Sequence, residues 1–139
     1  MGLDMYLTGD SFNNSYGEHK RPQHDGFDIR ATRLDMGYWR KHRMLHGYIV
    51  QNFANGEDDC RPIDLGEEEL LQIETALLKW ADNSAALPKT EGFFFGDDEG
   101  DEYYRKRAKE DAGMFREARR WLQKKQDDVW KSVEYEASW

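Results

Sequence analysis

The sequence predicts an α+β fold, in which a small N-terminal antiparallel sheet packs on three helices and the C-terminal helix is the longest. Two patterns predict it. Near the N-terminus apolar residues alternate with polar ones, as in half-buried strands, and three later stretches repeat apolar residues at three- and four-residue steps, as in helices. With 139 residues the chain can bury one core, so we expect a single domain over residues 1–139.

The composition limits the classes of partner. A net charge of −8 argues against direct binding to DNA or an anionic membrane, although it allows an acidic mimic of nucleic acid. Aromatic residues make up 14% of the chain, which argues against disorder. The single cysteine, Cys60, fits a reducing intracellular setting and is expected to be a small buried hydrophobe. Neither a signal peptide nor a membrane span is recognisable, so we expect a cytoplasmic protein.

Two short strands are expected near the N-terminus. Leu3–Leu7 alternates between apolar and polar residues, and Phe27–Thr32 does the same, so the two would pair. Between them, Thr8–Gly26 is rich in Gly, Asn, Ser and Asp and has no period. That segment is expected to be a long loop.

Three helices are expected in the rest of the chain. The first covers Met36–Phe53 with Asp35 as its N-cap, and the second runs from about Asp64 to Asp82. The third, Glu99–Val133, repeats apolar residues at helical steps over its whole length. Residues 134–139 have no predicted partner.

Gly92–Gly96 holds three consecutive phenylalanines between two glycines, and acidic residues over 97–102 follow it. We expect the phenylalanines to dock in the core, with the glycines allowing sharp turns on either side. The acids complement the dipole at the start of the third helix. A divalent cation is the alternative for these acids, but their spacing does not fit an EF-hand loop.

A second group of residues suggests a binding site for an anionic ligand. An aromatic residue and two cations near a helix start can stack a base and hold a phosphate. A solvated basic pair beside a core tryptophan is the alternative. Acids and tyrosines in the first turn of the third helix are expected to face this group. The predicted ligand-binding residues are Trp39, Arg40, Lys41, His46, Asp101, Glu102, Tyr103 and Tyr104.

His42 and His46 lie four residues apart, which can place two imidazoles on one metal. Arg43 follows His42, and a cation at that position disfavours a metal. We therefore expect no metal and no cofactor, and histidines that are hydrogen-bonded to carboxylates. None of the common catalytic motifs is present, so no catalytic residue is assigned.

Three blocks of the sequence together resemble a group of small phage and prophage proteins. These blocks are Met1–Leu7, Gly37–Lys41 with His46 after it, and Gly92–Gly96 followed by Asp101–Tyr104. The resemblance implies a phage-encoded accessory protein of the host cytoplasm. Small phage proteins of this kind often counter host defence, by sequestering a nucleotide signal or by blocking a defence protein. The resemblance supplies no catalytic mechanism.

Three functions follow from these observations. The leading hypothesis is a non-enzymatic counter-defence protein that binds a small anionic, nucleotide-like ligand. The second is an inhibitor of a host defence or nucleic-acid-handling protein, with an acidic mimic as one form of it. The third is a small hydrolase of a nucleotide signal, with His46 and a nearby carboxylate as its acid–base pair. Trp130, Tyr135 and Trp139 either cover a homo-oligomer surface or are disordered.

Overall fold

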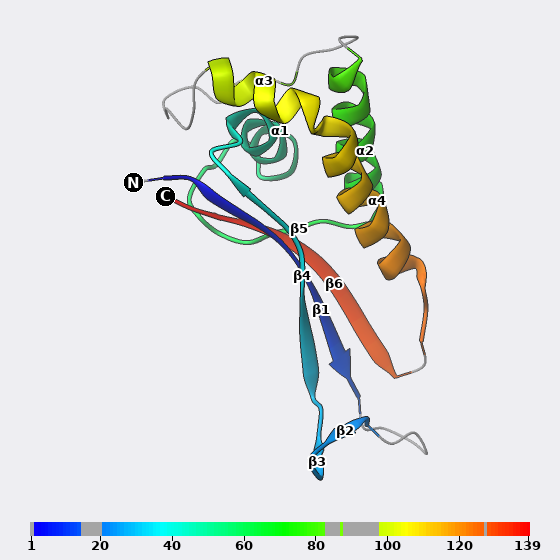
Figure 1. Ribbon diagram of the computed structural model, residues 1–139. Coiled ribbons are helices and arrows are strands. Elements are labelled where there is room, and N and C mark those ends of the chain that lie inside the picture. The colour runs from blue at the N-terminus through cyan, green and yellow to red at the C-terminus, as the bar shows by residue number, and fades with distance from the viewer. Residues whose placement is uncertain (1, 15–20, 83–86, 88–97, 127) are drawn as a thin grey trace.

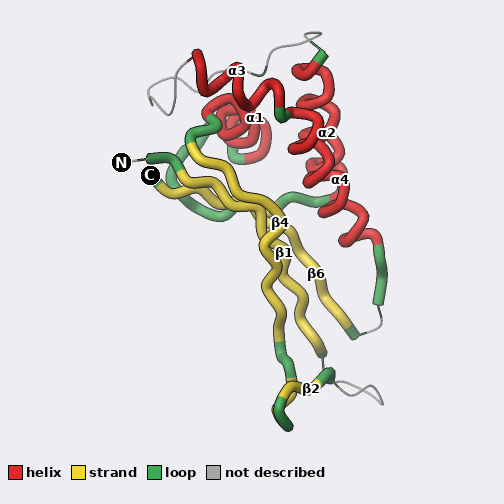
Figure 2. Tube along the Cα trace, in the orientation of Figure 1, coloured by secondary structure: helices red, strands yellow, loops and turns green. Residues whose placement is uncertain are grey.

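The computed structural model describes residues 2–14, 21–82, 87, 98–126 and 128–139 (Figure 1). Within these ranges the chain forms a four-stranded antiparallel sheet, a two-stranded hairpin and four helices. The helices gather on one side of the sheet (Figure 2), so the α+β fold class is confirmed. The elements are β1 (Asp4–Asn13), β2 (Gln23–His24), β3 (Phe27–Asp28), β4 (Ala31–Arg40), α1 (Arg43–Phe53), β5 (Ile63–Asp64), α2 (Glu67–Ala81), α3 (Asp98–Lys106), α4 (Ala108–Gln123) and β6 (Val129–Ser138).

β1 is an inner strand of the sheet, whose order is β4-β1-β6-β5. Asp4 at its start lies opposite Arg40 of β4 on one side and Ser138 of β6 on the other. The first and last strands of the chain are therefore neighbours, and the chain ends lie close together (Figure 1). The sheet is built from both ends of the chain rather than from the N-terminal part alone.

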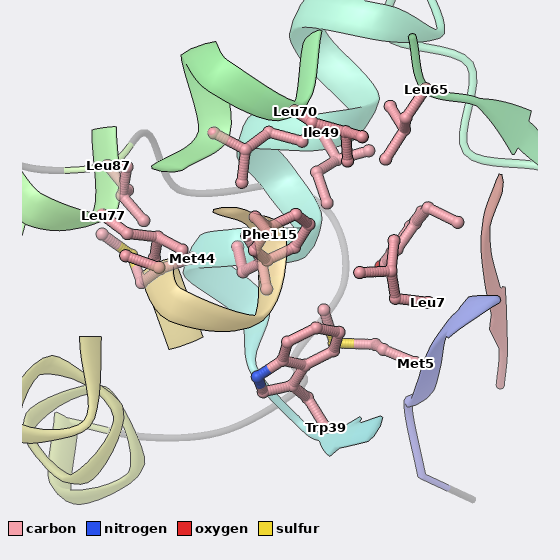
Figure 3. Packing of buried hydrophobic residues seen from close by; sticks show 14 of the residues in the cluster. Met5, Leu7, Trp39, Met44, Ile49, Leu65, Leu70, Leu77, Leu87 and Phe115 are labelled. Atoms are coloured by element: carbon pink, nitrogen blue, oxygen red, sulfur yellow. The ribbon is translucent and has the colours of Figure 1, made fainter. Parts of the chain in front are cut away.

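The hydrophobic core lies between the sheet and the helices. Met5 and Leu7 alternate with polar or exposed residues along β1, so both side chains point to the helical side, where they are fully buried. Trp39 of β4 stacks on Phe115 of α4, with ring centroids 5.4 Å apart and planes at 12° (Figure 3). Burying a large apolar side chain contributes about 1.5–3 kcal/mol, so these contacts hold α4 on the sheet.

The predicted helix over Met36–Phe53 is wrong in its first part. Residues 36–40 complete β4, and α1 begins only at Arg43. Residues 36–40 form a strand rather than a helix because Trp39 packs in the core opposite Met5, while Tyr38 points to the other face. The N-cap is His42 rather than Asp35, since the His42 ring accepts a hydrogen bond from the backbone of Leu45.

The predicted single helix over Glu99–Val133 is also wrong. It is divided into α3 and α4 at Arg107, and the chain then leaves the helix and returns as β6. Val129 and Val133 are four residues apart, a spacing that suits a helix and also one face of a strand. Residues 134–138, for which no partner was expected, pair with β1.

Other expectations near the N-terminus need correction as well. The segment Thr8–Gly26 is not all loop, because β1 continues to Asn13 and β2 lies within it. Cys60 is exposed rather than buried.

The predicted Gly92–Gly96 anchor lies outside the described residues. The second helix is confirmed as α2 over Glu67–Ala81, but its expected start at Asp64 is wrong, because Asp64 belongs to β5 and Gly66 is the N-cap. No helix in the described ranges is both long enough and apolar enough to cross a membrane.

Two glycines offer a matched test of this packing. A Cβ at Gly37 would come within 2.6 Å of the Trp39 ring, which folds back over the strand, whereas a Cβ at Gly113 would meet only the end of Arg116 at 3.6 Å. We expect Gly37→Ala to lower the free energy of unfolding by about 1–3 kcal/mol through overpacking. Gly113→Ala should raise it by up to about 1 kcal/mol, because Gly is a poor helix former. Urea unfolding measures both, and equal effects would contradict the packing.

Candidate functional site

The end of β4, the start of α1 and helix α3 meet at one corner of the molecule, and several predicted site residues lie there. The Tyr104 hydroxyl accepts a hydrogen bond from the backbone N–H of Arg40 at 3.1 Å and donates one to its carbonyl at 2.6 Å. Arg40 and Tyr104 are 64 residues apart in sequence. The expectation that α3 faces Arg40 is therefore met by Tyr104, whereas His46, expected in the same group, lies with Asp58 and Tyr135 instead.

Lys41 turns the chain from β4 into α1. Its φ of 57° is left-handed, which few residues other than glycine adopt, and its N–H donates to the Leu3 carbonyl at 2.7 Å. The Arg40 and Lys41 side chains are exposed and form no ion pair with the described residues. These two cations are therefore open to solvent.

The predicted residues of α3 already have protein partners. Arg43 Nε lies 3.0 Å from both carboxylate oxygens of Asp101, in a fork that is largely shielded from solvent. Glu102 pairs with Arg105 at 3.5 Å. The guanidinium of Arg107 donates to the Tyr103 hydroxyl at 2.8 Å and lies over its ring. Of these contacts, the Arg43–Asp101 pair joins α3 to α1, while the other two lie within α3 and between α3 and Arg107, which directly follows it.

His42 lies at the centre of this corner and is fully buried. Its ring stacks on Tyr104 with centroids 4.1 Å apart, and its Nδ1 accepts from the Leu45 N–H at 3.3 Å. Burial lowers the pKa of His42 to about 3, so the imidazole is neutral at physiological pH. Its Nε2 has no hydrogen-bond partner within the described part of the chain.

Trp39 and Asp111 form a second buried polar contact behind this corner, with side chains 2% and 1% exposed. Burial raises the pKa of the Asp111 carboxyl, while the indole N–H of Trp39 and the charge of Arg107 oppose the rise. The indole N–H nevertheless lacks hydrogen-bond geometry toward Asp111, whose oxygens have no other partner among the described residues. Trp39 therefore lies in the core, where its ring is covered by Phe115.

His46 lies one turn along α1 from His42, within a buried hydrogen-bonded triad. Its Nε2 is 2.8 Å from Asp58 Oδ1, and its Nδ1 is 2.6 Å from the Tyr135 hydroxyl. Burial lowers the pKa of His46 against the opposing pull of Asp58, and burial raises the pKa of Tyr135 well above its usual value. The neutral imidazole thus donates from Nε2 to Asp58 and accepts at Nδ1 from Tyr135.

This triad joins α1, the segment after it and β6. The expectation that the histidines bond to carboxylates is thus met by His46 but not by His42, which has no carboxylate partner among the described residues. Asp58 is the carboxylate beside His46 that sequence reasoning could not name. Asp58 lies in the irregular segment between α1 and β5, whose sequence has no periodic pattern from which its position could be predicted. Among the described residues no group of His, Cys, Asp and Glu is arranged to hold a metal.

The opposite face of the sheet, which we call the open face, was missed by sequence reasoning. The register that places Met5 opposite Trp39 on the helical side also places Tyr6 opposite Tyr38 on the open face. Four large aromatic side chains are exposed there: Tyr6 (42%), Phe12 (47%), Tyr38 (54%) and Trp130 (73%). The alternation of residues 129–138 was the signal that could have found the β6 part of this face.

Carboxylates surround these aromatic side chains. By register, the open face carries Asp4, Asp10, Asp35, Asp64, Glu134 and Glu136. Arg33 compensates part of this charge, at 2.9 Å from Glu134 and 3.6 Å from Asp10. Partial burial and the nearby carboxylates raise the pKa of Glu134. The open face is thus aromatic and predominantly acidic.

The buried His42 predicts a loss of stability in mild acid. Its pKa in the folded chain is about 3, against 6.5 in the unfolded chain, so only the unfolded state takes up this proton as the pH falls below 6.5. The contribution of His42 is complete above pH 6.5 and is lost toward pH 3, with a slope that approaches about 1.4 kcal/mol per pH unit. His46 acts in the same direction, and Asp111 and Glu134, whose pKa values are raised, act in the opposite one.

Substitution isolates the part that is due to His42. We expect His42→Asn to flatten the dependence of the unfolding free energy on pH between 6.5 and 4.5, because Asn still accepts the capping hydrogen bond but does not titrate. Urea titrations at several pH values measure it. His24→Asn is the control, since His24 is exposed on the β2–β3 hairpin. An unchanged slope in His42→Asn would show that other groups dominate.

Tyr135→Phe tests the triad. Removal of the hydroxyl leaves His46 Nδ1 buried without its donor, so we expect the free energy of unfolding to fall by about 1–3 kcal/mol. Tyr6→Phe, which removes a hydroxyl from an exposed side chain, should have little effect. Denaturant unfolding compares the two variants, and ¹⁵N spectra of the His46 ring report the tautomer. Equal stability of the two variants would argue against the hydrogen bond.

Comparison of the sequence with protein-family models and with curated proteins, and of the structure with solved structures, finds no match. What this chain binds must therefore be inferred from its own surface.

Proposed function

We propose that the protein is a non-enzymatic binding protein whose partner is another protein, held on the open face of the sheet. The observation that carries this proposal is the group of four exposed aromatic side chains, Tyr6, Phe12, Tyr38 and Trp130, on a face that the helices leave uncovered. Exposed aromatic groups rimmed by polar residues are typical of protein interfaces, where such side chains provide most of the binding energy.

The charges of the open face favour a basic partner. Its carboxylates outnumber its cations, and three of them, at Asp10, Asp64 and Glu136, disfavour the charged form of Glu134. A lysine or arginine of a partner would relieve this repulsion, and tyrosine and tryptophan rings attract cations as well. The same charges disfavour nucleic acid and other anionic surfaces.

The resemblance to phage proteins suggests the biological setting of this proposal. In that setting the partner is a host protein, and its capture counters host defence.

A small anionic ligand is the second candidate, and one observation favours it. Arg40 and Lys41 are exposed and lack ion-pair partners among the described residues, and Lys41 is the left-handed residue at which the chain turns into α1. The rest of the predicted set supports it less, because Trp39 and His46 are buried and Asp101 is paired with Arg43. Calorimetry with a panel of nucleotides and cyclic nucleotides tests this candidate, and Arg40→Ala should abolish any heat that is observed.

A hydrolase is supported least. His46 does have a carboxylate beside it, at Asp58, as such a mechanism requires. Both ring nitrogens are engaged, however, and the side chains of His46 and Tyr135 are fully buried. A substrate would have to displace these hydrogen bonds to reach the imidazole.

The open-face proposal is tested by capture from host lysate with matched variants. We expect the wild-type chain to retain a stoichiometric partner, which high salt releases because the attraction is partly ionic. Tyr6→Ser combined with Trp130→Ser should lose it. Leu71→Ser combined with Leu78→Ser is the control, because these side chains are exposed apolar residues of α2. A partner that is lost with the α2 variant and kept by the open-face variant would refute the proposal.

A further inference from the structure

β4 lies at one end of the four-stranded sheet, and among the described residues only β1 pairs with it in that sheet. At the last residue of β4, the outward backbone groups are already occupied, because the Tyr104 hydroxyl bonds to both the N–H and the carbonyl of Arg40. The next residue, Lys41, points its N–H inward to Leu3. The backbone direction therefore alternates at this end of the strand as an antiparallel ladder requires.

The same alternation applies two residues earlier. Tyr38 has the orientation of Arg40, so its backbone N–H and carbonyl point outward from the sheet edge. No side chain of the described residues bonds to them as Tyr104 bonds to Arg40. Tyr38 thus presents one donor and one acceptor, in the geometry that an additional strand would use.

Two hollows flank this part of the edge. On the helical side, a hollow of about 450 Å³ lies between β4 and α4, and Met36, Met114 and Trp121 form apolar parts of its wall. On the open face, a hollow of about 390 Å³ is lined by Tyr6 and Tyr38. Met36 lines both hollows. Each is large enough to accept a bulky side chain.

Met36 is shared because of a β-bulge. The register between β1 and β4 shifts between Leu7 and Thr8, so Met36 is an extra residue with no opposite partner. Its side chain lies over Gly9, where a Cβ would leave no room for it, and beside Trp121. The bulge therefore places an apolar side chain at the floor of the groove between β4 and α4.

We propose that an extended segment of a partner protein adds to the edge of β4 at Tyr38 as a further strand, with alternate side chains entering the two hollows. Successive residues of a strand point to opposite faces, so an apolar residue in the β4–α4 hollow has its neighbours on the Tyr6–Tyr38 side. This inference rests on the proposed function, because it assumes that the partner is a protein.

The charges around the hollows specify the segment further. Glu110 and Glu117 lie along the β4–α4 hollow with Arg116, and Asp35 lies at the other hollow. Glu110 pairs with Arg107 at 3.7 Å and Glu117 with Arg120 at 2.8 Å, so the acidic excess lies on the Tyr6–Tyr38 side. The segment should therefore carry lysine or arginine on that side, next to its apolar anchor. A second copy of this chain is disfavoured, because each copy has a charge of −8 and the bulge interrupts any symmetric pairing of β4 with itself.

A library of random linear peptides displayed against the full chain supplies the probe. We expect selected peptides to carry an apolar or aromatic residue flanked by basic ones, and amide exchange at Tyr38 to slow when a peptide binds. Gly113→Trp should weaken peptide binding about tenfold or more, since its side chain fills the hollow from a position with free space. Tyr38→Pro should weaken it more than Tyr38→Ala, because both remove the ring that lines the second hollow and only proline also removes the outward N–H, while the β1 ladder stays intact.

The controls are Leu71→Ser and Leu78→Ser on the exposed side of α2, which leave the edge and both hollows in place and should bind the peptides like the wild type. Failure to select peptides, or selected peptides that bind Gly113→Trp and the wild type equally, would overturn the inference. A dimer that Gly113→Trp dissociates in sedimentation would also overturn it, because the edge would then hold a second copy.

If lysate capture depends on Trp130 but not on Gly113, the proposed function stands and strand addition is refuted. If neither matters, the proposed function itself falls.

Discussion

The pairing of β1 with both β4 and β6 is the constraint on which the rest of the structure depends. One ten-residue strand at the N-terminus forms a ladder on each side, and one of them joins it to the last ten-residue strand of the chain. The contacts of β1 with β6 close loops of more than a hundred residues, so they form only at a large cost in chain entropy. The apolar face of β1, with Leu3 before it and Met5 and Leu7 within it, offsets this cost by burying against the helices.

Because the helices cover only one face of this sheet, polar groups divide into two populations. Those on the helical side, such as His42, His46 and Asp111, are buried. Burial lowers the pKa of the two histidines and raises the pKa of Asp111, which favours the neutral form of each. Those on the open face are at least partly exposed and surround the exposed aromatic side chains. Several residues that resemble ligand-binding groups in the sequence, Trp39 and His46 above all, belong to the first population and stabilise the fold.

The sequence predicts an element well where a long stretch of apolar residues fits only one type of secondary structure. It predicts poorly where the spacing of the apolar residues fits both a helix and a strand. Helix α2 was predicted because a long apolar stripe follows an acidic first turn. β6 was not, because Val129 and Val133 fit a helix as well as a strand, and its partner lies at the other end of the chain. The contact of Tyr104 with Arg40 could be anticipated, because Gly37–Lys41 and Asp101–Tyr104 both combine aromatic and charged residues near predicted helix starts. The carboxylate of Asp58 beside His46 could not, since only tertiary packing brings the two together.

The edge of β4 shows how the same constraint leaves one place open. A free edge beside exposed aromatic residues promotes association unless it is protected. Three features of this chain protect it: the bulge at Met36, the Tyr104 hydroxyl on Arg40, and a net charge of −8. The first two act at either side of Tyr38 and leave its own backbone groups facing outward, while the third repels acidic partners and attracts basic ones. What remains exposed is therefore selective: a short stretch of edge, with a hollow on each face, that suits a basic extended segment better than a second copy of the chain.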